Sequence, residues 1–283
     1  MPNYKVVNAD QLDADLEAVA QAIRTKGGTS ASLAFPSGFV SAVEGIQSGG
    51  GVGNSDAIIM RTATEITSNA TEIGSYAFYT YTTLTSAIFP MATKIGASAF
   101  YGCSSLDTVS FPYVTSAGPS AFRGCSKLNR ISLNIPIVSG QIFYGCAVLE
   151  VADMGQAKSI ALQAFYNCYC LKALVLRSNS VATLASSNAL ANCHWLKGTT
   201  NETHNPTGGV GYVYVPRSLT SRDLILGEYE KNTNWKNAGV RFRALEDYTL
   251  DGTIDGELDI EKMLADLEGS GGGSIGGGDQ EIM

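Results

Sequence analysis

Five cysteines recur at a nearly constant spacing along the middle of the chain, and their thiols are the first candidates for chemistry. Successive members of this column are 22, 21, 22 and 25 residues apart: Cys103, Cys125, Cys146, Cys168 and Cys193. Zinc sites usually have two to four residues between paired cysteines, so the column does not indicate a metal centre. Disulfides are not favoured in a reducing compartment. We therefore predict free thiols that pack as small apolar side chains.

Two other segments match metal-ligand patterns in part. Cys168-Tyr-Cys170 and Cys193-His194 bring thiols and a histidine together in sequence, but neither has the usual spacing of a zinc half-site. Residues 251–256 have the Asp and Gly places of a calcium loop, yet Thr253 and Lys262 stand where further ligands are needed. Asp-Gly pairs are typical of tight turns. We predict a β-hairpin there, and neither a metal nor a cofactor.

Catalytic groups are not evident in the sequence. The chain has two histidines, His194 and His204, and it lacks a Gly-x-Ser-x-Gly elbow. The glycines at 49–53 are not followed by the Lys and Ser or Thr of a phosphate-binding loop. We predict that both histidines are structural or loop residues and that the protein is not an enzyme.

The composition disfavours several classes of partner. The 283 residues include 26 acidic and 19 basic side chains, and the resulting net charge of −7 argues against a protein that coats nucleic acid. No run of about 18 apolar residues predicts a membrane helix. Residues 1–10 lack the basic and apolar segments of a secretory signal. We therefore expect assembly in a cytoplasm and no contact with membrane.

The cysteines belong to a repeat of about 22 residues. An aromatic residue or leucine stands three residues before each cysteine place, and a leucine stands three residues after it. The aromatic column is Phe78, Phe100, Phe122, Phe143 and Phe165. A unit of this length cannot bury its apolar face alone, so neighbouring units must stack.

Each unit predicts a short strand, a second extended piece and a tight helical turn. In the strand segment 106–111, apolar residues at positions 1, 4 and 6 give alternation toward the end, and Pro112 ends the strand. Positions 3 and 5 then face outward. The candidate partner-binding residues at these positions are Ser86, Thr108, Ser110, Arg130, Ser132 and Asp153, and the other outward residues are Ile88, Val151, Ala173 and Val175.

Two alternatives to this binding face stay open. The outward positions carry few charges and no aromatic cluster, so they are also compatible with an ordinary solvated sheet face. Tyrosines at the turns offer a second, aromatic surface, although some of them must pack between coils: Tyr79, Tyr101, Tyr144, Tyr166 and Tyr169.

The unit Ile-Gly-x-x-Ala-Phe-x-x-Cys-x-x-Leu-x-x-Val-x-Phe-Pro resembles the BspA-type leucine-rich repeat of bacterial surface proteins and phage proteins. The resemblance covers about residues 64–200 and implies an α/β solenoid with one parallel sheet on its concave face. Beyond Leu196 the pattern departs from the repeat. There we predict a closing strand at 211–216 and a helical cap over 218–235, which would cover the open end of the solenoid.

The flanks complete the predicted domain organisation. The spacing of Leu12, Leu16, Val19 and Ile23 is that of a heptad repeat, whose apolar residues share one helix face. The predicted parts are a helical hairpin for anchoring or oligomerisation at 1–48, a Gly-rich linker at 49–55, the capped solenoid at 56–245, a hairpin with a short amphipathic helix at 246–268, and a Gly-rich tail at 269–283.

Residues 8–46 and 214–248 resemble segments of phage tail and fibre-associated proteins. This resemblance implies a non-enzymatic virion component of the tail fibre, tail tip or baseplate, whose repeat surface attaches to the host cell. Its partners would be other tail proteins, bound through the N-terminal hairpin, and a bacterial surface protein or glycan. We also expect a homo-oligomer. The alternative is a BspA-like adhesin on the surface of a bacterial cell.

Overall fold

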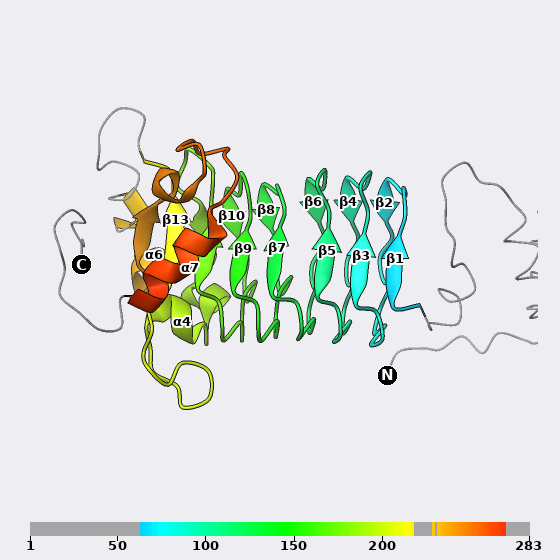
Figure 1. The fold of residues 1–283 in the computed structure, drawn as a ribbon, viewed down its shortest axis with the longest axis horizontal. Helices are drawn as coiled ribbons and strands as arrows, with labels where there is room; N and C mark the ends of the chain where they lie inside the picture. The colour runs from blue at the N-terminus through cyan, green and yellow to red at the C-terminus, as the bar shows by residue number, and fades with distance from the viewer. Residues whose placement is uncertain (1–62, 218–227, 230, 270–283) are drawn as a thin grey trace, which may run out of the picture. The chain divides into compact units, whose positions relative to one another are not determined.

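The computed structural model describes residues 63–217, 228–229 and 231–269. The predicted hairpin at 1–48, the linker at 49–55, the tail beyond residue 269 and most of the segment 218–231 lie outside these residues. The described part is a solenoid of parallel strands, which confirms the fold class that the repeat predicts (Figure 1).

Each coil contributes two short strands to two rows of parallel pairs. The first row holds β1 (Glu65–Thr67), β3 (Ser86–Ile88), β5 (Thr108–Ser110), β7 (Arg130–Ser132), β9 (Val151–Asp153), β11 (Ala173–Val175), β13 (Tyr212–Val215) and β14 (Phe242–Ala244). The second row holds β2 (Glu72–Ile73), β4 (Lys94–Ile95), β6 (Ser116–Ala117), β8 (Ile137–Val138), β10 (Ser159–Ile160) and β12 (Thr183–Leu184). Because the register places Ile66 opposite Ala87 and Ala87 opposite Val109, equivalent residues of adjacent coils lie side by side.

The phenylalanine column forms the centre of the solenoid core. Successive rings from Phe78 to Phe165 stack with centroids 5.1, 5.3, 5.6 and 5.2 Å apart. The predicted thiol column lies beside it, buried and unoxidised. Each thiol donates to the carbonyl oxygen of a phenylalanine in the preceding coil, as Cys125 Sγ does to Phe100 at 3.2 Å. The repeat therefore satisfies its buried thiols between coils.

The turns between the two rows differ from the helical turn that the sequence predicts. Ser98 and Gly102, on either side of Phe100, have φ angles of 54° and 71°, and equivalent residues in the other coils are also left-handed. Such residues interrupt a right-handed helix, so the chain forms hydrogen-bonded turns instead. In the described coils, the last turn of this kind is helical, as the 3-10 helix η1 (Ser187–Leu190).

Both rows are interrupted at one junction, which we call the seam. Within the described chain, no backbone hydrogen bond joins β5 to β7 or β6 to β8. In neighbouring coils, Thr115 and Lys158 donate a backbone N–H to the preceding coil, whereas Pro136 at the equivalent place has none to donate. The Ser139 hydroxyl donates to the Ala117 carbonyl oxygen at 2.6 Å instead. At the turns, the coils on either side of the seam remain hydrogen-bonded, because the Phe122 N–H donates to the Ile142 carbonyl.

The C-terminal end of the solenoid is capped by non-repeat elements. The helix α4 (His194–Lys197) precedes the inserted loop, and β13 follows that loop. We predicted 211–216 as the closing strand, but β14 pairs with the outer edge of β13 and extends the row. The helix α6 (Thr233–Ala238) buries Trp235 completely, and its indole N–H donates to the Ala182 carbonyl at 2.7 Å.

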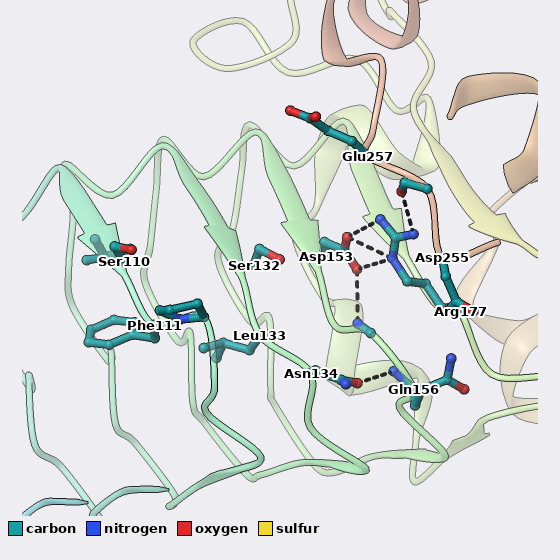
Figure 2. Close-up of a pocket in the computed structure, with 14 residues that line it drawn as sticks. Ser110, Phe111, Ser132, Leu133, Asn134, Asp153, Gln156, Arg177, Asp255 and Glu257 are labelled. Atoms are coloured by element: carbon teal, nitrogen blue, oxygen red, sulfur yellow. Dashed lines mark hydrogen bonds and ion pairs between the residues drawn. The ribbon is translucent and has the colours of Figure 1, made fainter. Parts of the chain in front are cut away.

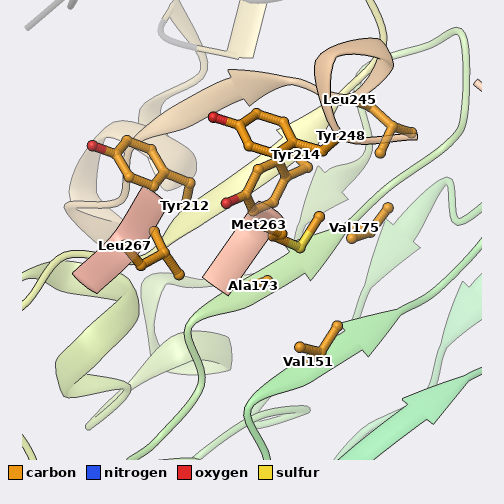
Figure 3. Packing of buried hydrophobic residues seen from close by; sticks show 9 residues of the cluster. All are labelled: Val151, Ala173, Val175, Tyr212, Tyr214, Leu245, Tyr248, Met263 and Leu267. Atoms are coloured by element: carbon orange, nitrogen blue, oxygen red, sulfur yellow. The ribbon is translucent and has the colours of Figure 1, made fainter. Parts of the chain in front are cut away.

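Residues 245–269, which we call the C-terminal cover, fold back onto the first row of strands. The cover consists of the 3-10 helix η2 (Leu245–Tyr248), a loop and the helix α7 (Ile260–Gly269). The loop is closed by an antiparallel bridge between Thr249 and Leu258, in line with the hairpin that the Asp-Gly pairs predict. Figure 3 shows the cluster that results, which comprises Val151, Ala173, Val175, Tyr212, Tyr214, Leu245, Tyr248, Met263 and Leu267.

Candidate functional site

The outward side chains of β1, β3, β5 and β7 form an open surface, which we call the polar strip. Its residues are Glu65, Thr67, Ser86, Ile88, Thr108, Ser110, Arg130 and Ser132, and all are exposed or half-exposed. The strand alternation that the sequence predicts is confirmed in β1, β3 and β7, where Ile66, Ala87 and Ile131 are buried. In β5, beside the seam, Val109 is half-exposed.

The same face is closed over the next strands, which corrects the exposure we expected there. Val151, Ala173 and Val175 are buried beneath the C-terminal cover. Asp153 is only 6% exposed. The prediction that these side chains point outward from the sheet is confirmed. The pattern of the repeat does not reveal, however, that a distant segment of the chain packs on them.

Asp153 is held by Arg177 in a bidentate ion pair. The Arg177 Nε and Nη2 atoms donate to the Asp153 carboxylate at 2.7–3.2 Å. The Arg177 Nη1 atom donates to the carbonyl oxygens of Ile254 and Gly256 at 2.6 and 2.9 Å. Arg177 thereby ties the loop of the C-terminal cover to the coil that carries Asp153. Its donors are largely used, so its role is to hold this loop in place.

A groove of about 550 Å³ lies where the polar strip meets the C-terminal cover. Ser110, Ser132 and Asp153 stand in a row on three successive strands, with Phe111 and Leu133 beside them (Figure 2). The facing wall carries Arg177, Asp255, Gly256 and Glu257. The groove crosses the seam between β5 and β7, so it opens where the sheet is interrupted.

The charge of the groove is set by the loop of the cover. Asp153 and Arg177 neutralise each other, which leaves the carboxylates of Asp255 and Glu257. No described residue forms an ion pair with either carboxylate. The hydroxyls of Ser110 and Ser132 also form no hydrogen bond with another described residue. The groove thus offers hydroxyls and carboxylates above an apolar floor, a surface that suits binding by hydrogen bonds and charge.

Three of the six predicted binding residues, Ser110, Ser132 and Asp153, line this groove, and Ser86, Thr108 and Arg130 lie on the polar strip. Arg177, Asp255 and Glu257 were not predicted, since none belongs to a repeat position that faces outward. One signal could have indicated the cover: outward residues change from Ser, Thr and Arg to Val151, Ala173, Val175 and the tyrosines of β13.

The other candidate groups do not form a reaction centre. Burial raises the pKa of the Cys146 and Cys193 thiols to about 12, so these thiols stay protonated. His204 stacks on Tyr169 with centroids 4.1 Å apart, and His194 stacks on the same ring at 5.9 Å. Burial, with His204 and Lys197 nearby, lowers the pKa of His194. Within the part of the chain that the structure describes, no three metal-binding side chains cluster.

Asp251, the first residue of the suspected calcium loop, is engaged locally. Its Oδ1 atom accepts from the backbone N–H and the hydroxyl of Thr253, both at 2.9 Å. These bonds lower the pKa of its carboxyl.

The described helices include none that is both long and apolar enough to cross a membrane.

The fold and this surface define a leucine-rich-repeat solenoid whose first row of strands carries an open, largely polar face. The pattern of the BspA type leucine rich repeat region matches residues 61–172 and 93–204, together about half of the chain, in six copies. The chain therefore belongs to the BspA-type leucine-rich repeat family.

Several solved structures resemble the chain over part of its length. They include a leucine rich cell surface protein from Faecalibacterium prausnitzii (23% identity, TM-score 0.41, 52% of this chain and 36% of that one). A leucine-rich repeat protein from Bacteroides ovatus is also similar (25% identity, TM-score 0.43, 55% of this chain and 40% of that one). So is a leucine rich repeat protein of T. pallidum (22% identity, TM-score 0.30, 56% of this chain and 54% of that one). The chain thus spans between about a third and half of these proteins. No protein of curated function matches the sequence.

Proposed function

We propose that the chain is a non-enzymatic attachment protein, an adhesin of the BspA type, which binds a partner at a bacterial cell surface through the polar strip and the adjoining groove. The observation that carries this proposal is the division of one sheet face. The face is covered over β9, β11 and β13 but open over β1, β3, β5 and β7, where its outward side chains are largely polar. Membership of the BspA-type family supports the adhesin in particular.

The groove favours a protein partner with a basic group. The free carboxylates of Asp255 and Glu257 stand at one end of the polar strip, and complementary charge speeds and orients association. The strip itself offers no aromatic platform. A protein surface that places a lysine or arginine in the groove and lies along the strip would match both features.

A binding experiment on intact bacteria tests the role of the strip. Labelled protein is added to cells and measured by flow cytometry, and Ser132→Trp is compared with Ser116→Trp. Both serines are exposed strand residues, but Ser132 lies on the polar strip and Ser116 lies in the second row. We expect Ser132→Trp to reduce binding at least tenfold and Ser116→Trp to leave it unchanged. Equal binding by the two variants would overturn the proposal.

A bacteriophage virion component is the second candidate, favoured by the resemblance of residues 8–46 and 214–248 to phage tail proteins. In that case the N-terminal segment would join the protein to other tail proteins and to copies of itself. Mass spectrometry separates the two candidates. Peptides released by protease from the surface of intact producing cells support the adhesin, whereas peptides in purified virions support the tail component.

A further inference from the structure

A row of stacked side chains runs along the turns that follow β2, β4, β6, β8 and β10, away from the groove. It consists of Tyr79, Tyr101, Arg123, Tyr144 and Tyr166, one from each of five successive coils, and we call it the tyrosine–arginine column. Tyr79 stacks on Tyr101 with centroids 4.8 Å apart, and Tyr144 stacks on Tyr166 at 4.9 Å. The guanidinium of Arg123 fills the place between the pairs, 5.6 Å from Tyr101 and 4.2 Å from Tyr144.

The column is held rigidly. The backbone N–H groups of Gly102, Gly124 and Gly145 each donate to the carbonyl oxygen of the column residue in the next coil, at 2.7–2.8 Å. The stacked rings leave each other little rotational freedom. Tyrosines fixed in this way lose little conformational entropy on binding, so the cost of using this surface is low.

The column presents hydrogen-bonding edges to solvent. Because the faces of the rings are stacked, their edges and hydroxyls point outward, and Tyr101, Tyr144 and Tyr166 are each part-exposed. None of these three hydroxyls forms a hydrogen bond with another described residue. On one flank, Gln141 accepts from Arg123 at 2.6 Å and donates to Gln163 at 2.8 Å, so a row of amides accompanies the rings.

Small residues follow the column in its three middle coils, namely Gly102, Gly124 and Gly145. A methyl group added at Gly145 would meet nothing within 4 Å, and one at Gly124 would meet only the backbone of Gly102, at 3.6 Å, whereas one at Gly102 would meet the Thr80 side chain at 3.3 Å. A chain-like ligand could therefore lie beside the rings without displacing side chains. The repeat spacing would offer that ligand a ring with a hydroxyl at Tyr101, Tyr144 and Tyr166, with amides beside the last two at Gln141 and Gln163.

We propose that the tyrosine–arginine column is a second binding surface, which takes a neutral, linear polysaccharide. An apolar ligand would leave the phenol and amide groups without partners, at a cost for each. A polyanion needs several cations, and the column holds one, Arg123, whose guanidinium lies between two rings. A chain of sugar hydroxyls with C–H faces matches the hydroxyls, amides and ring edges together. This surface is separate from the polar strip.

The test uses an array of purified neutral linear glycans, with dextran sulfate and double-stranded DNA as polyanion probes. The triple variant Tyr101→Phe, Tyr144→Phe, Tyr166→Phe keeps the stacked rings and removes the hydroxyls, so its melting temperature should match that of the parent. Tyr113→Phe is the matched control, since Tyr113 is 61% exposed and outside the column. A second variant, Gln141→Ala with Gln163→Ala, removes the amides and leaves the tyrosines.

We expect the parent and Tyr113→Phe to bind at least one neutral glycan, and both column variants to bind it at least tenfold more weakly. The proposal is wrong if no neutral glycan binds, if only the polyanions bind, or if the triple variant binds as tightly as the parent. Ser132→Trp should not affect glycan binding, so failure here is distinguishable from failure of the strip.

Discussion

At the residue scale, the molecule uses charge where the repeat meets the non-repeat segment. Arg177 and Asp153 are both nearly buried, with side chains 12% and 9% exposed. A buried ion pair does not itself imply high stability, but removal of one partner leaves an uncompensated charge. The pair is therefore a sensitive point, because it also positions the loop that walls the groove.

Replacement of Arg177 by methionine should lower the free energy of unfolding by about 3–5 kcal/mol, the usual cost of leaving one buried partner alone. Lys94→Met breaks the Lys94–Glu72 pair, whose side chains are 57% and 64% exposed, and should cost no more than about 1 kcal/mol. Urea denaturation measures both. Adding Asp153→Asn to Arg177→Met should recover part of the loss, and a double variant as unstable as the single one would contradict this account.

The thiol column makes stability depend on alkaline pH. Burial raises the pKa of Cys125, Cys146, Cys168 and Cys193 from the ordinary value near 9, to about 12 for Cys146 and Cys193. Above pH 9 the unfolded chain loses these protons while the folded chain keeps them. Stability should therefore be full below pH 9 and fall between pH 9 and 12, by up to about 1.4 kcal/mol per pH unit for each thiol.

Urea denaturation between pH 7 and pH 10.5 checks this dependence. The double variant Cys146→Ala, Cys168→Ala should have a smaller slope above pH 9, although it is less stable than the parent at neutral pH. Cys170→Ala serves as the control, because that thiol lies outside the column and is only partly buried. An unchanged slope in the double variant would show that other groups cause the loss.

At the scale of elements, the C-terminal cover decides which part of the sheet face is available. The strands β9, β11 and β13 turn apolar side chains outward, and these would be exposed to water without η2 and α7. The amphipathic stripe of α7 is visible in the sequence, but local periodicity does not encode its docking place. The cover therefore both protects an apolar patch and limits the polar strip to the preceding strands.

Met263 is the test of this packing, since it is fully buried between α7 and the sheet. Met263→Ala should cost about 2–5 kcal/mol, as for other large-to-small substitutions in a core. It should also increase binding of the dye ANS, because the apolar face opens more often. Leu250→Ala, at a leucine that is 67% exposed in the same cover, should change neither quantity. Equal effects of the two substitutions would mean that the cover is not packed as described.

At the scale of the whole molecule, the sequence largely predicts the repeat, but it does not predict the seam or the groove. The phase of Phe100, Cys103 and Leu106 predicts coils, a shared core and outward residues, because each coil contacts only its neighbours. In the second row, the seam coincides with Pro136, whose missing N–H matters only once the coils are aligned. The groove depends on Arg177 meeting the carbonyls of Ile254 and Gly256, a contact between segments 77 and 79 residues apart. Such a contact has no periodic signature.

The seam predicts that the solenoid can unfold in two blocks. Across it, Phe122 stacks on Phe143 at 5.6 Å, and turn hydrogen bonds replace the missing strand pairing. In a repeat array, stability is a sum of coil and interface contributions, so weakening this stack should uncouple the coils on either side. Both tryptophans, Trp195 and Trp235, lie on the C-terminal side. Their fluorescence therefore follows one block, whereas far-UV circular dichroism follows the whole chain.

Phe122→Ala should separate the two signals in urea denaturation, with the circular dichroism transition beginning at lower urea than the fluorescence transition. In the parent, the continuous phenylalanine column should make the two transitions coincide. Phe165→Ala is the matched control, because it removes the same ring from the same column within the C-terminal block. In Phe165→Ala, the fluorescence transition should itself shift to lower urea, because the C-terminal block loses about 3–5 kcal/mol of its free energy of unfolding. Coincident transitions in Phe122→Ala would mean that the missing strand pairs at the seam do not weaken the coupling between the blocks.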